Sequence, residues 1–289
     1  MMQGMRACLS AYSVVLTCLV CWGLLTAPAT SANAGQDNGC GQLYLISTGV
    51  GDPDLATIRA VEAMQESDII ICRDDTRQKF SKYLEGKTFW EGAFEHWRTH
   101  GETCDTLDDP EKREKCRQDR IVRQKLEERI RSAVAKGKTV AVMGSGDMFI
   151  YGGPYRWYRE EMADLNLESI PGVSCLNAAN ALIGKDLMGG STVHAAVLTH
   201  YRGIDKLAKH QPTMVVFTMR TEFSDLVDKL REYYPDDTPI AVAFFAGDKE
   251  KEYTISGQLD SIEAKTADID FPFEHLVYVG DFMKEPPRQ

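Results

Sequence analysis

The feature that most restricts the fold is a regular alternation of two kinds of segment between Leu43 and Val279. Short runs rich in Val and Ile predict buried strands, and longer runs with apolar residues at helical spacing predict helices. The expected strands are residues 43–46, 68–72, 139–143, a short one near Ile170, 195–198, 214–218, 240–244, 253–256 and 276–279. The expected helices are residues 53–64, 121–135, 154–164, 174–183, 222–233 and 259–265. Alternation of this kind is typical of α/β folds, in which helices cover a sheet.

The first helix and the segment before the helix at 121–135 carry further local signals. Asp52 is the expected N-cap and Pro53 the first helical residue. The expected apolar face of this helix is Leu55, Ile58, Val61 and Met64. From Thr88 to Arg120 the apolar pattern breaks down, so we expect an insertion or a mobile loop there.

A glycine-rich stretch from Gly184 to Ser191 interrupts the alternation, and a second α/β block follows it. We therefore expect two α/β domains, residues 41–188 and residues 189–285, joined near this stretch. The sequence contains no internal repeat and no low-complexity segment.

The first 34 residues have the pattern of a secretory signal peptide. Arg6 is their only charge, an apolar run extends from Val14 to Leu25, and Ala32-Asn33-Ala34 supplies an A-x-A cleavage site. The alternative is an uncleaved anchor helix, but the run is shorter than the about 20 residues that span a bilayer. We expect cleavage after Ala34, export to the periplasm and no membrane span in the mature chain.

Charge and cysteine content limit the partners. Without Arg6 the chain has 32 basic and 43 acidic residues, a net charge of −11, which gives no basic footprint for nucleic acid.

The five remaining cysteines show no spacing typical of a metal site, so no metal is expected. In an oxidising compartment Cys104 and Cys116 could form a disulfide or stay free. Cys72 and Cys175 lie among apolar residues and are expected to be buried thiols.

Three glycine-containing loops follow expected strands: residues 48–53, 144–147 and 171–174. Ligands of open α/β sheets bind beyond the carboxyl ends of the strands. A dinucleotide fingerprint is excluded because Asp54 replaces its third glycine and Asp52 would repel a pyrophosphate. A ligand without phosphate fits better, and S-adenosylmethionine (SAM) is one.

Three motifs, in order, resemble the SAM-dependent tetrapyrrole (corrin/porphyrin) methylase family. LYLISTGVGDPDLATIRAVEAMQESDIII is similar to the opening strand, Gly-Asp-Pro loop and helix of that family. VAVMGSGDMFIYGG resembles its second Gly-Asp signature, and ESIPGVSCLNAANALIG its Pro-Gly segment. The remainder, through PTMVVFTM, TPIAVAFFAGDKEKEYTISGQL and HLVYVGDFM, resembles the second domain. The likeness extends from Leu43 to Met283.

The resemblance implies a homodimer of two-domain subunits, each with SAM in the cleft between its domains. It assigns to the cofactor site Val50, Gly51, Ser145, Gly146, Asp147, Ile150, Ser174 and Cys175, with Thr218 or Met219 and Ala246 or Gly247 from the second domain. The carboxylate of Asp147 would accept hydrogen bonds from the amino group or hydroxyls of the cofactor; the alternative is that Asp147 caps the following helix.

The acceptor side departs from the family pattern. Arg73 falls where many members have an aspartate, and Asp74 follows it, so these two are the candidate catalytic residues. Asp75, His96 and His100 are alternative proton acceptors. The carboxylates of a tetrapyrrole would pair with cations, of which the candidates are Arg73, Lys79, Arg98, His194, His200 and Arg202.

The resemblance implies a SAM-dependent methyltransferase acting on a tetrapyrrole or related small molecule. One alternative is an exported, non-enzymatic tetrapyrrole-binding protein that reuses the fold, because the acceptor segment is altered and a signal precedes the domain. Methylation of RNA or of a protein, which relatives of this fold perform, is disfavoured by the acidic charge and the export signal.

Overall fold

The computed structural model describes residues 41–188, 193 and 195–284. The predicted signal peptide, residues 1–34, lies outside the described residues. Within the described residues no helix is long and apolar enough to cross a bilayer.

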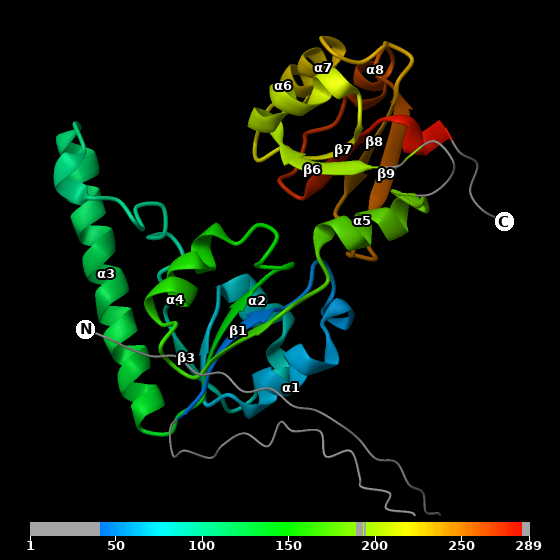
Figure 1. Ribbon diagram of the computed structural model, residues 1–289. Helices are drawn as coiled ribbons and strands as arrows, with labels where there is room; N and C mark the ends of the chain where they lie inside the picture. The colour runs from blue at the N-terminus through cyan, green and yellow to red at the C-terminus, as the bar shows by residue number, and fades with distance from the viewer. Residues whose placement is uncertain (1–40, 189–192, 194, 285–289) are drawn as a thin grey trace, which may run out of the picture. The chain divides into compact units, whose positions relative to one another are not determined.

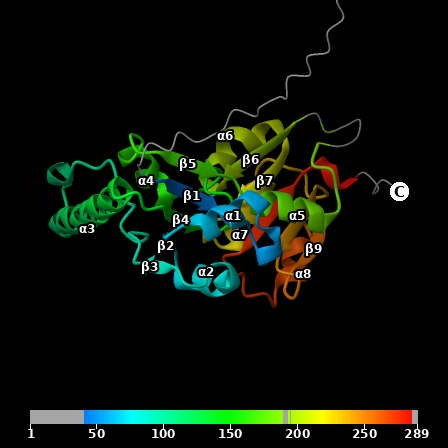
Figure 2. The same ribbon diagram turned by 90° about the horizontal axis from the view of Figure 1, so that it is seen from below.

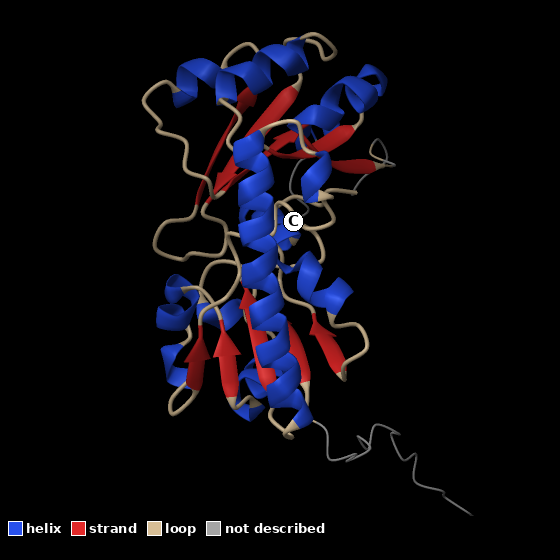
Figure 3. Cartoon of the chain, turned by 90° about the vertical axis from the view of Figure 1, so that its left-hand side faces the viewer, coloured by secondary structure: helices blue, strands red, loops and turns tan. Residues whose placement is uncertain are grey.

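The first half of the described chain forms a five-stranded sheet in the order β3-β2-β4-β1-β5, and every neighbouring pair is parallel. Its strands are β1 (Leu43–Ser47), β2 (Ile69–Ile71), β3 (Thr88–Trp90), β4 (Val140–Gly144) and β5 (Leu167–Ile170). Figure 3 shows these strands as arrows that point the same way. The loops after all five strands therefore lie at one edge of the sheet.

Helices cover both faces of this sheet: α1 (Ile58–Glu66), α2 (Asp74–Lys79), α3 (Pro110–Ala135) and α4 (Arg156–Glu161). Side chains alternate across a strand, so Leu45 packs with α3 and α4 in one core cluster, whereas Ile46 packs with α1 in another. Both faces are thus buried, as expected for a parallel sheet.

A second five-stranded sheet follows, in the order β6-β7-β10-β8-β9 (Figure 1). Its strands are β6 (Ala196–His200), β7 (Thr213–Phe217), β8 (Pro239–Phe244), β9 (Tyr253–Gln258) and β10 (His275–Val279). Only β6 and β7 pair in parallel; the other three pairs are antiparallel. The helices of this block are α5 (Cys175–Ile183), α6 (Ile204–Leu207), α7 (Phe223–Arg231) and α8 (Ile262–Thr266).

The second sheet also has two covered faces: in Figure 1, α6, α7 and α8 lie above its strands and α5 below them, and Figure 2 gives the view from below. One core cluster joins its strands to α6, α7 and α8, and another joins them to α5 and Phe282. The α/β class is therefore confirmed. The boundary between residues 188 and 189 stays a prediction.

The first helix differs from the expectation. Pro53–Leu55 form a separate 3-10 turn (η1), and Asp52 makes no side-chain capping bond there. Helix α1 begins later, where the hydroxyl of Thr57 accepts a hydrogen bond from the N–H of Ala60. The predicted apolar face was wrong at Ile58, whose side chain is 79% exposed. The buried residues of α1 are Ala60, Ala63 and Met64, because the break at Ala56 changes the helical phase.

The segment 88–120 is more ordered than expected. It contains strand β3, a 3-10 turn at Cys104–Thr106 (η3) and the first half of α3, a helix that was predicted to begin only at Ile121. The missed start is at Asp109, whose carboxylate accepts hydrogen bonds from the N–H groups of Glu111 and Lys112, with Pro110 in the first turn. Before Ile121 the buried residues of this helix are only Cys116 and Asp119, so apolar periodicity gave no signal there.

We predict that Asp109→Ala destabilises the protein by about 1 kcal/mol, because two N–H groups at the start of α3 lose their acceptor. Urea unfolding measures the change. Asp108→Ala is the matched control, since only the backbone of that exposed residue makes a hydrogen bond to α3. Equal stability of the two variants would contradict the assignment of the cap.

Candidate active site

Loops from four strands of the first sheet meet at its carboxyl edge. Residues 48–53 follow β1, residues 145–153 follow β4, residues 171–174 follow β5, and Cys72 and Arg73 follow β2. Open α/β sheets bind ligands at this edge. The three loops predicted from their glycines are therefore brought together by the topology.

Two of the glycine loops are joined backbone to backbone. The N–H of Gly49 donates to the carbonyl of Gly146 (3.2 Å), and the N–H of Gly146 donates to the carbonyl of Gly49 (2.8 Å). The third loop is held by the N–H of Val50, which donates to the carbonyl of Val173 (3.0 Å). A Cβ on Gly172 would lie 2.6 Å from the oxygen of Gly146, so only glycine allows the loops to approach this closely.

Two buried hydroxyls that the sequence did not single out reinforce this arrangement. The hydroxyl of Thr48 donates to the carbonyl of Gly144 (3.2 Å), and the N–H of Met148 donates to the hydroxyl of Ser47 (3.1 Å). Both residues are inaccessible to solvent. A Ser-Thr pair at the end of a buried strand is the signal that would have indicated them.

Gly146 and Asp147 lie open at this edge. Gly146 has a φ of 70°, and a Cβ placed there would meet no atom within 4 Å, so its backbone faces open space. One carboxylate oxygen of Asp147 accepts from the N–H of Phe149 (2.8 Å). Among the described residues no group donates to the other oxygen. Asp147 does not cap α4, since the next helical turn begins only at Gly153.

The first glycine loop also contacts the second sheet. A Cβ on Gly51 would lie 2.1 Å from the carbonyl of Gly247, and the N–H of Asp52 donates to that carbonyl (2.8 Å). The N–H of Lys249 donates to the carboxylate of Asp52 (3.1 Å). The ammonium of Lys249 pairs with Asp54, and this hydrogen bond holds the pKa of the Asp54 carboxyl below its usual value.

A second link brings the end of β7, which Thr218 and Met219 follow, beside the second Gly-Asp signature. The ring of Tyr151 stacks on that of Phe217 with 5.4 Å between the centroids. Thr218 is buried and its hydroxyl is engaged with Nε2 of His275 (2.8 Å), whereas Met219 is 42% exposed with a φ of 53°. Of this predicted pair, Met219 is therefore the side chain that is free to contact a ligand.

The remaining predicted cofactor residues lie at the start of α5 and after β8. The hydroxyl of Ser174 caps α5 by accepting from the N–H of Asn177 (3.3 Å). Cys175 packs against the core cluster that contains Ala246. Burial raises the pKa of the Cys175 thiol, so this side chain contributes packing and not a thiolate.

A pocket of about 200 Å³ lies beside these loops. Its lining residues are Leu45, Met148, Phe149, Gly152, Gly153, Tyr155, Arg156 and Arg159. The ring of Tyr155 packs over Gly144, where a Cβ would lie 2.4 Å from it. Burial raises the pKa of the Tyr155 hydroxyl to about 12, which keeps it protonated at neutral pH. The two arginines were not predicted, because sequence gives no sign that they share a pocket with the glycine loops.

The two candidate catalytic residues differ in their surroundings. The guanidinium of Arg73 lies 5.8 Å from the ring centre of Phe94 and 3.5 Å from Glu95, and its charge acts on Tyr155. Arg73 is thus on the pocket side of the edge. Asp74 is exposed in the first turn of α2.

Most of the other charged candidates already have a partner, although for Arg202 this holds only for the backbone N–H. His96 pairs with Asp119 (2.7 Å) and His100 with Glu160 (2.9 Å). The carboxylate of Asp75 accepts from the N–H of Thr76. The ammonium of Lys79 donates to the carbonyl of Gly51 (2.6 Å). The guanidinium of Arg98 lies over the ring of the neighbouring Trp97. Nδ1 of His200 accepts from the N–H of Arg202, and His194 lies outside the described residues.

The described residues contain no cluster of three or more His, Cys, Asp or Glu side chains that could hold a metal ion. Cys72 and Cys175 are free thiols, and both are half-buried and not fully buried as expected. Burial raises the pKa of Cys72 to about 11.

We predict that Gly51→Ala destabilises the protein at least twice as much as Gly86→Ala. Both glycines have a left-handed φ, 64° and 73°, so the backbone strain of about 1 kcal/mol is shared. Only at position 51 does the new methyl collide with another backbone, that of Gly247. Urea unfolding of both variants tests this, and equal losses would show that the close approach is absent.

Comparisons with known proteins identify relatives of this chain. The model of the family described as Tetrapyrrole (Corrin/Porphyrin) Methylases matches residues 42–263. The cobalt-precorrin-4 C(11)-methyltransferase of Methanocaldococcus jannaschii is 28% identical over 84% of this chain and 88% of its own length. The precorrin-4 C(11)-methyltransferase of Pseudomonas aeruginosa is 25% identical over 83% of this chain and 90% of its own.

Solved structures show the same fold. A cobalt precorrin-4 methyltransferase superposes with a TM-score of 0.62 at 21% identity and covers 83% of this chain and 94% of its own. The uroporphyrin-III C-methyltransferase of Thermus thermophilus, solved with S-adenosylhomocysteine, gives 0.60 at 17% identity over 84% of this chain and 99% of its own. With the family model matching most of the chain, this protein belongs to the tetrapyrrole methylase family.

Proposed function

We propose that this protein is a SAM-dependent C-methyltransferase that acts on a tetrapyrrole precursor. The observation that carries the proposal is the joined pair of glycine loops, which leaves Gly146 and one oxygen of Asp147 open beside a pocket with two arginines. Relatives of this chain are methyltransferases of precorrin-4 and uroporphyrinogen III. The activity is assigned from these residues and relatives together, since a fold by itself does not fix function.

The residues at the edge suit the methyl donor. The free oxygen of Asp147 can accept from an ammonium or a ribose hydroxyl, and the bare backbone of Gly146 lets a ligand approach closely. The exposed side chains of Ile150 and Met219 offer apolar contact, and Gly247 adds no side-chain bulk. When bound, SAM supplies an electrophilic methyl group on a sulfonium. The roles of Val50, Ser145, Ser174, Cys175 and Ala246 in holding it stay predictions.

The pocket side suits an acidic acceptor. Arg156 and Arg159 line the pocket, and Arg73 lies beside Tyr155, so three guanidiniums can pair with carboxylates of the acceptor. Methyl transfer is an in-line displacement, so the main contribution of the protein is to orient the acceptor carbon. The proposed proton acceptor is Asp74, an exposed carboxylate one residue from Arg73.

The charge of Asp147 provides the test of the donor site. We predict that Asp147→Asn weakens the binding of S-adenosylhomocysteine at least tenfold in isothermal titration, because the amide is neutral. Its oxygen can still accept from the N–H of Phe149, so the melting temperature should equal that of the wild type. Unchanged affinity in this variant would leave Asp147 as a turn residue and refute its role in binding.

We further propose that the protein is exported and acts outside the cytosol. The sequence of residues 1–34 supports this, and so does the disulfide between Cys104 and Cys116, since disulfides persist in oxidising compartments. Expression of the full chain in a bacterial host should yield periplasmic protein whose first residue is Gly35. Intact protein confined to the cytoplasm would refute export.

The expected homodimer also stays a prediction. Leu198 on the edge strand β6 and Met188 are exposed apolar side chains. Association of two copies would remove side chains of this kind from water.

A further inference from the structure

The least familiar part of the sequence, Gly92–Leu107, packs between α3 and the pocket. We propose that this segment is a disulfide-fastened support behind the pocket that sets its acceptor specificity, and that Trp97 is its positioning residue. The proposal rests on the proposed function, because it takes the pocket to be the acceptor site.

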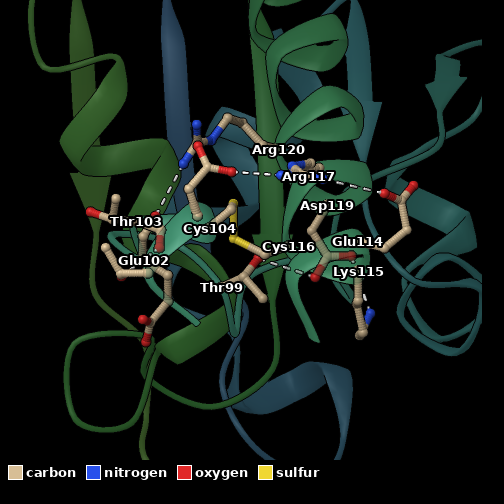
Figure 4. Close-up of a disulfide and its surroundings, with 12 residues drawn as sticks. Thr99, Glu102, Thr103, Cys104, Glu114, Lys115, Cys116, Arg117, Asp119 and Arg120 are labelled. Atoms are coloured by element: carbon tan, nitrogen blue, oxygen red, sulfur yellow. Dashed lines mark hydrogen bonds and ion pairs between the residues drawn. A yellow bond between two sulfur atoms is a disulfide. The ribbon is translucent and has the colours of Figure 1, made fainter. Parts of the chain in front are cut away.

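One side of the segment is fastened to α3 (Figure 4). The disulfide joins Cys104 of η3 to Cys116 of α3, with the Cα atoms 5.5 Å apart. Around it, Arg117 pairs with Asp105 (2.6 Å) and Arg120 donates to the carbonyl of Glu102 (3.1 Å). A bridge across twelve residues restricts the unfolded chain and so favours this closed arrangement.

A buried carboxylate strengthens the same attachment. The side chain of Asp119 is 2% exposed and contacts His96 (2.7 Å), Thr99 (3.1 Å) and Lys115 (3.1 Å). Burial raises the pKa of Asp119, but these hydrogen bonds together hold it below its usual value. Arg123 donates to the hydroxyl of Thr99 (3.1 Å) as well, so the segment is tied to α3 at several points.

The opposite side of the segment forms the support of the pocket. The ring of Phe94 lies 5.7 Å from that of Tyr155, which lines the pocket. The ring of Trp97 lies so close to Gly153 that a Cβ there would be 2.6 Å from it. Nε2 of His100 contacts Glu160 of α4 (2.9 Å). The position of the pocket loop 152–155 therefore depends on where the segment holds Trp97.

The charges on this side select an acidic ligand. Glu160 neutralises Arg156 in part (2.7 Å), but among the described residues no carboxylate pairs with Arg159. Arg98 lies over the ring of Trp97, 5.1 Å from its centre, and adds a further cation to the segment. A pocket of about 200 Å³ accommodates one carboxylate-bearing arm of a tetrapyrrole and not the macrocycle. The position of the supporting segment thus controls how such an arm enters the pocket.

The contact between Trp97 and Gly153 allows a double-mutant test. We expect Trp97→Ala and Gly153→Ala each to weaken the affinity of the purified mature protein (residues 35–289) for uroporphyrin III about tenfold, measured by isothermal titration. The fold-loss of affinity in the double variant should be smaller than the product of the two single fold-losses. The reason is that the methyl group introduced at position 153 would fill part of the space left by the indole. Affinity for S-adenosylhomocysteine should stay within twofold. Trp97→Phe keeps an aromatic ring and should restore most of the loss.

Each other outcome has a definite meaning. Two outcomes would overturn the positioning role of Trp97. One is a double variant whose fold-loss of affinity equals the product of the single losses, and the other is single variants whose affinity for uroporphyrin III equals that of the wild type. Wild-type protein that binds S-adenosylhomocysteine but not uroporphyrin III would overturn the acidic-arm pocket. Failure to bind S-adenosylhomocysteine would refute the proposed function itself.

The fastening is tested separately by hydrogen–deuterium exchange. Cys104→Ser/Cys116→Ser should increase exchange of the backbone amides in residues 152–155 at least fivefold, while amides of β8 in the second sheet stay as in the wild type. Unchanged exchange in residues 152–155 would overturn the coupling of the disulfide to the pocket. This readout does not depend on the identity of the acceptor.

Discussion

The reciprocal hydrogen bonds between Gly49 and Gly146 are the contact on which the candidate site depends. They join the loops that follow the two central strands of the first sheet, and they require a left-handed backbone at both residues. The third loop then packs against them through Gly172. These backbone groups satisfy one another, and the buried hydroxyls of Ser47 and Thr48 add further hydrogen bonds. The carboxylate of Asp147 is not needed to hold the loops together, so it remains available to a ligand.

The same constraint explains what the sequence could predict. The glycines, the strand ends and the order of elements are local signals, so the α/β class and the meeting of the three glycine loops followed from them. The start of α3 was missed because the first half of this helix, which Asp109 caps, has almost no apolar stripe. The predicted apolar face of α1 was wrong because a break at Ala56 separates the 3-10 turn that begins at Pro53 from the helix. Arg156 and Arg159 could not be found, since only the packing of α4 brings them to the pocket.

The proposed donor and acceptor sides of the edge therefore differ in how they are built. The donor side consists mainly of backbone and small residues, and it resembles the family closely. The acceptor side uses long side chains from α4, from the end of β2 and from the segment behind the pocket, where the sequence departs from the family most. A disulfide in that segment provides stability that a short, polar stretch could not obtain from apolar burial.

The central claim is that methyl transfer takes place at this edge. It is tested most directly by incubating the protein with methyl-labelled SAM and either uroporphyrinogen III or precorrin-4, the acceptors of its relatives, and following the label by mass spectrometry. The account predicts a methylated tetrapyrrole and an equal amount of S-adenosylhomocysteine. Protein that binds S-adenosylhomocysteine but transfers no label to either acceptor would contradict it.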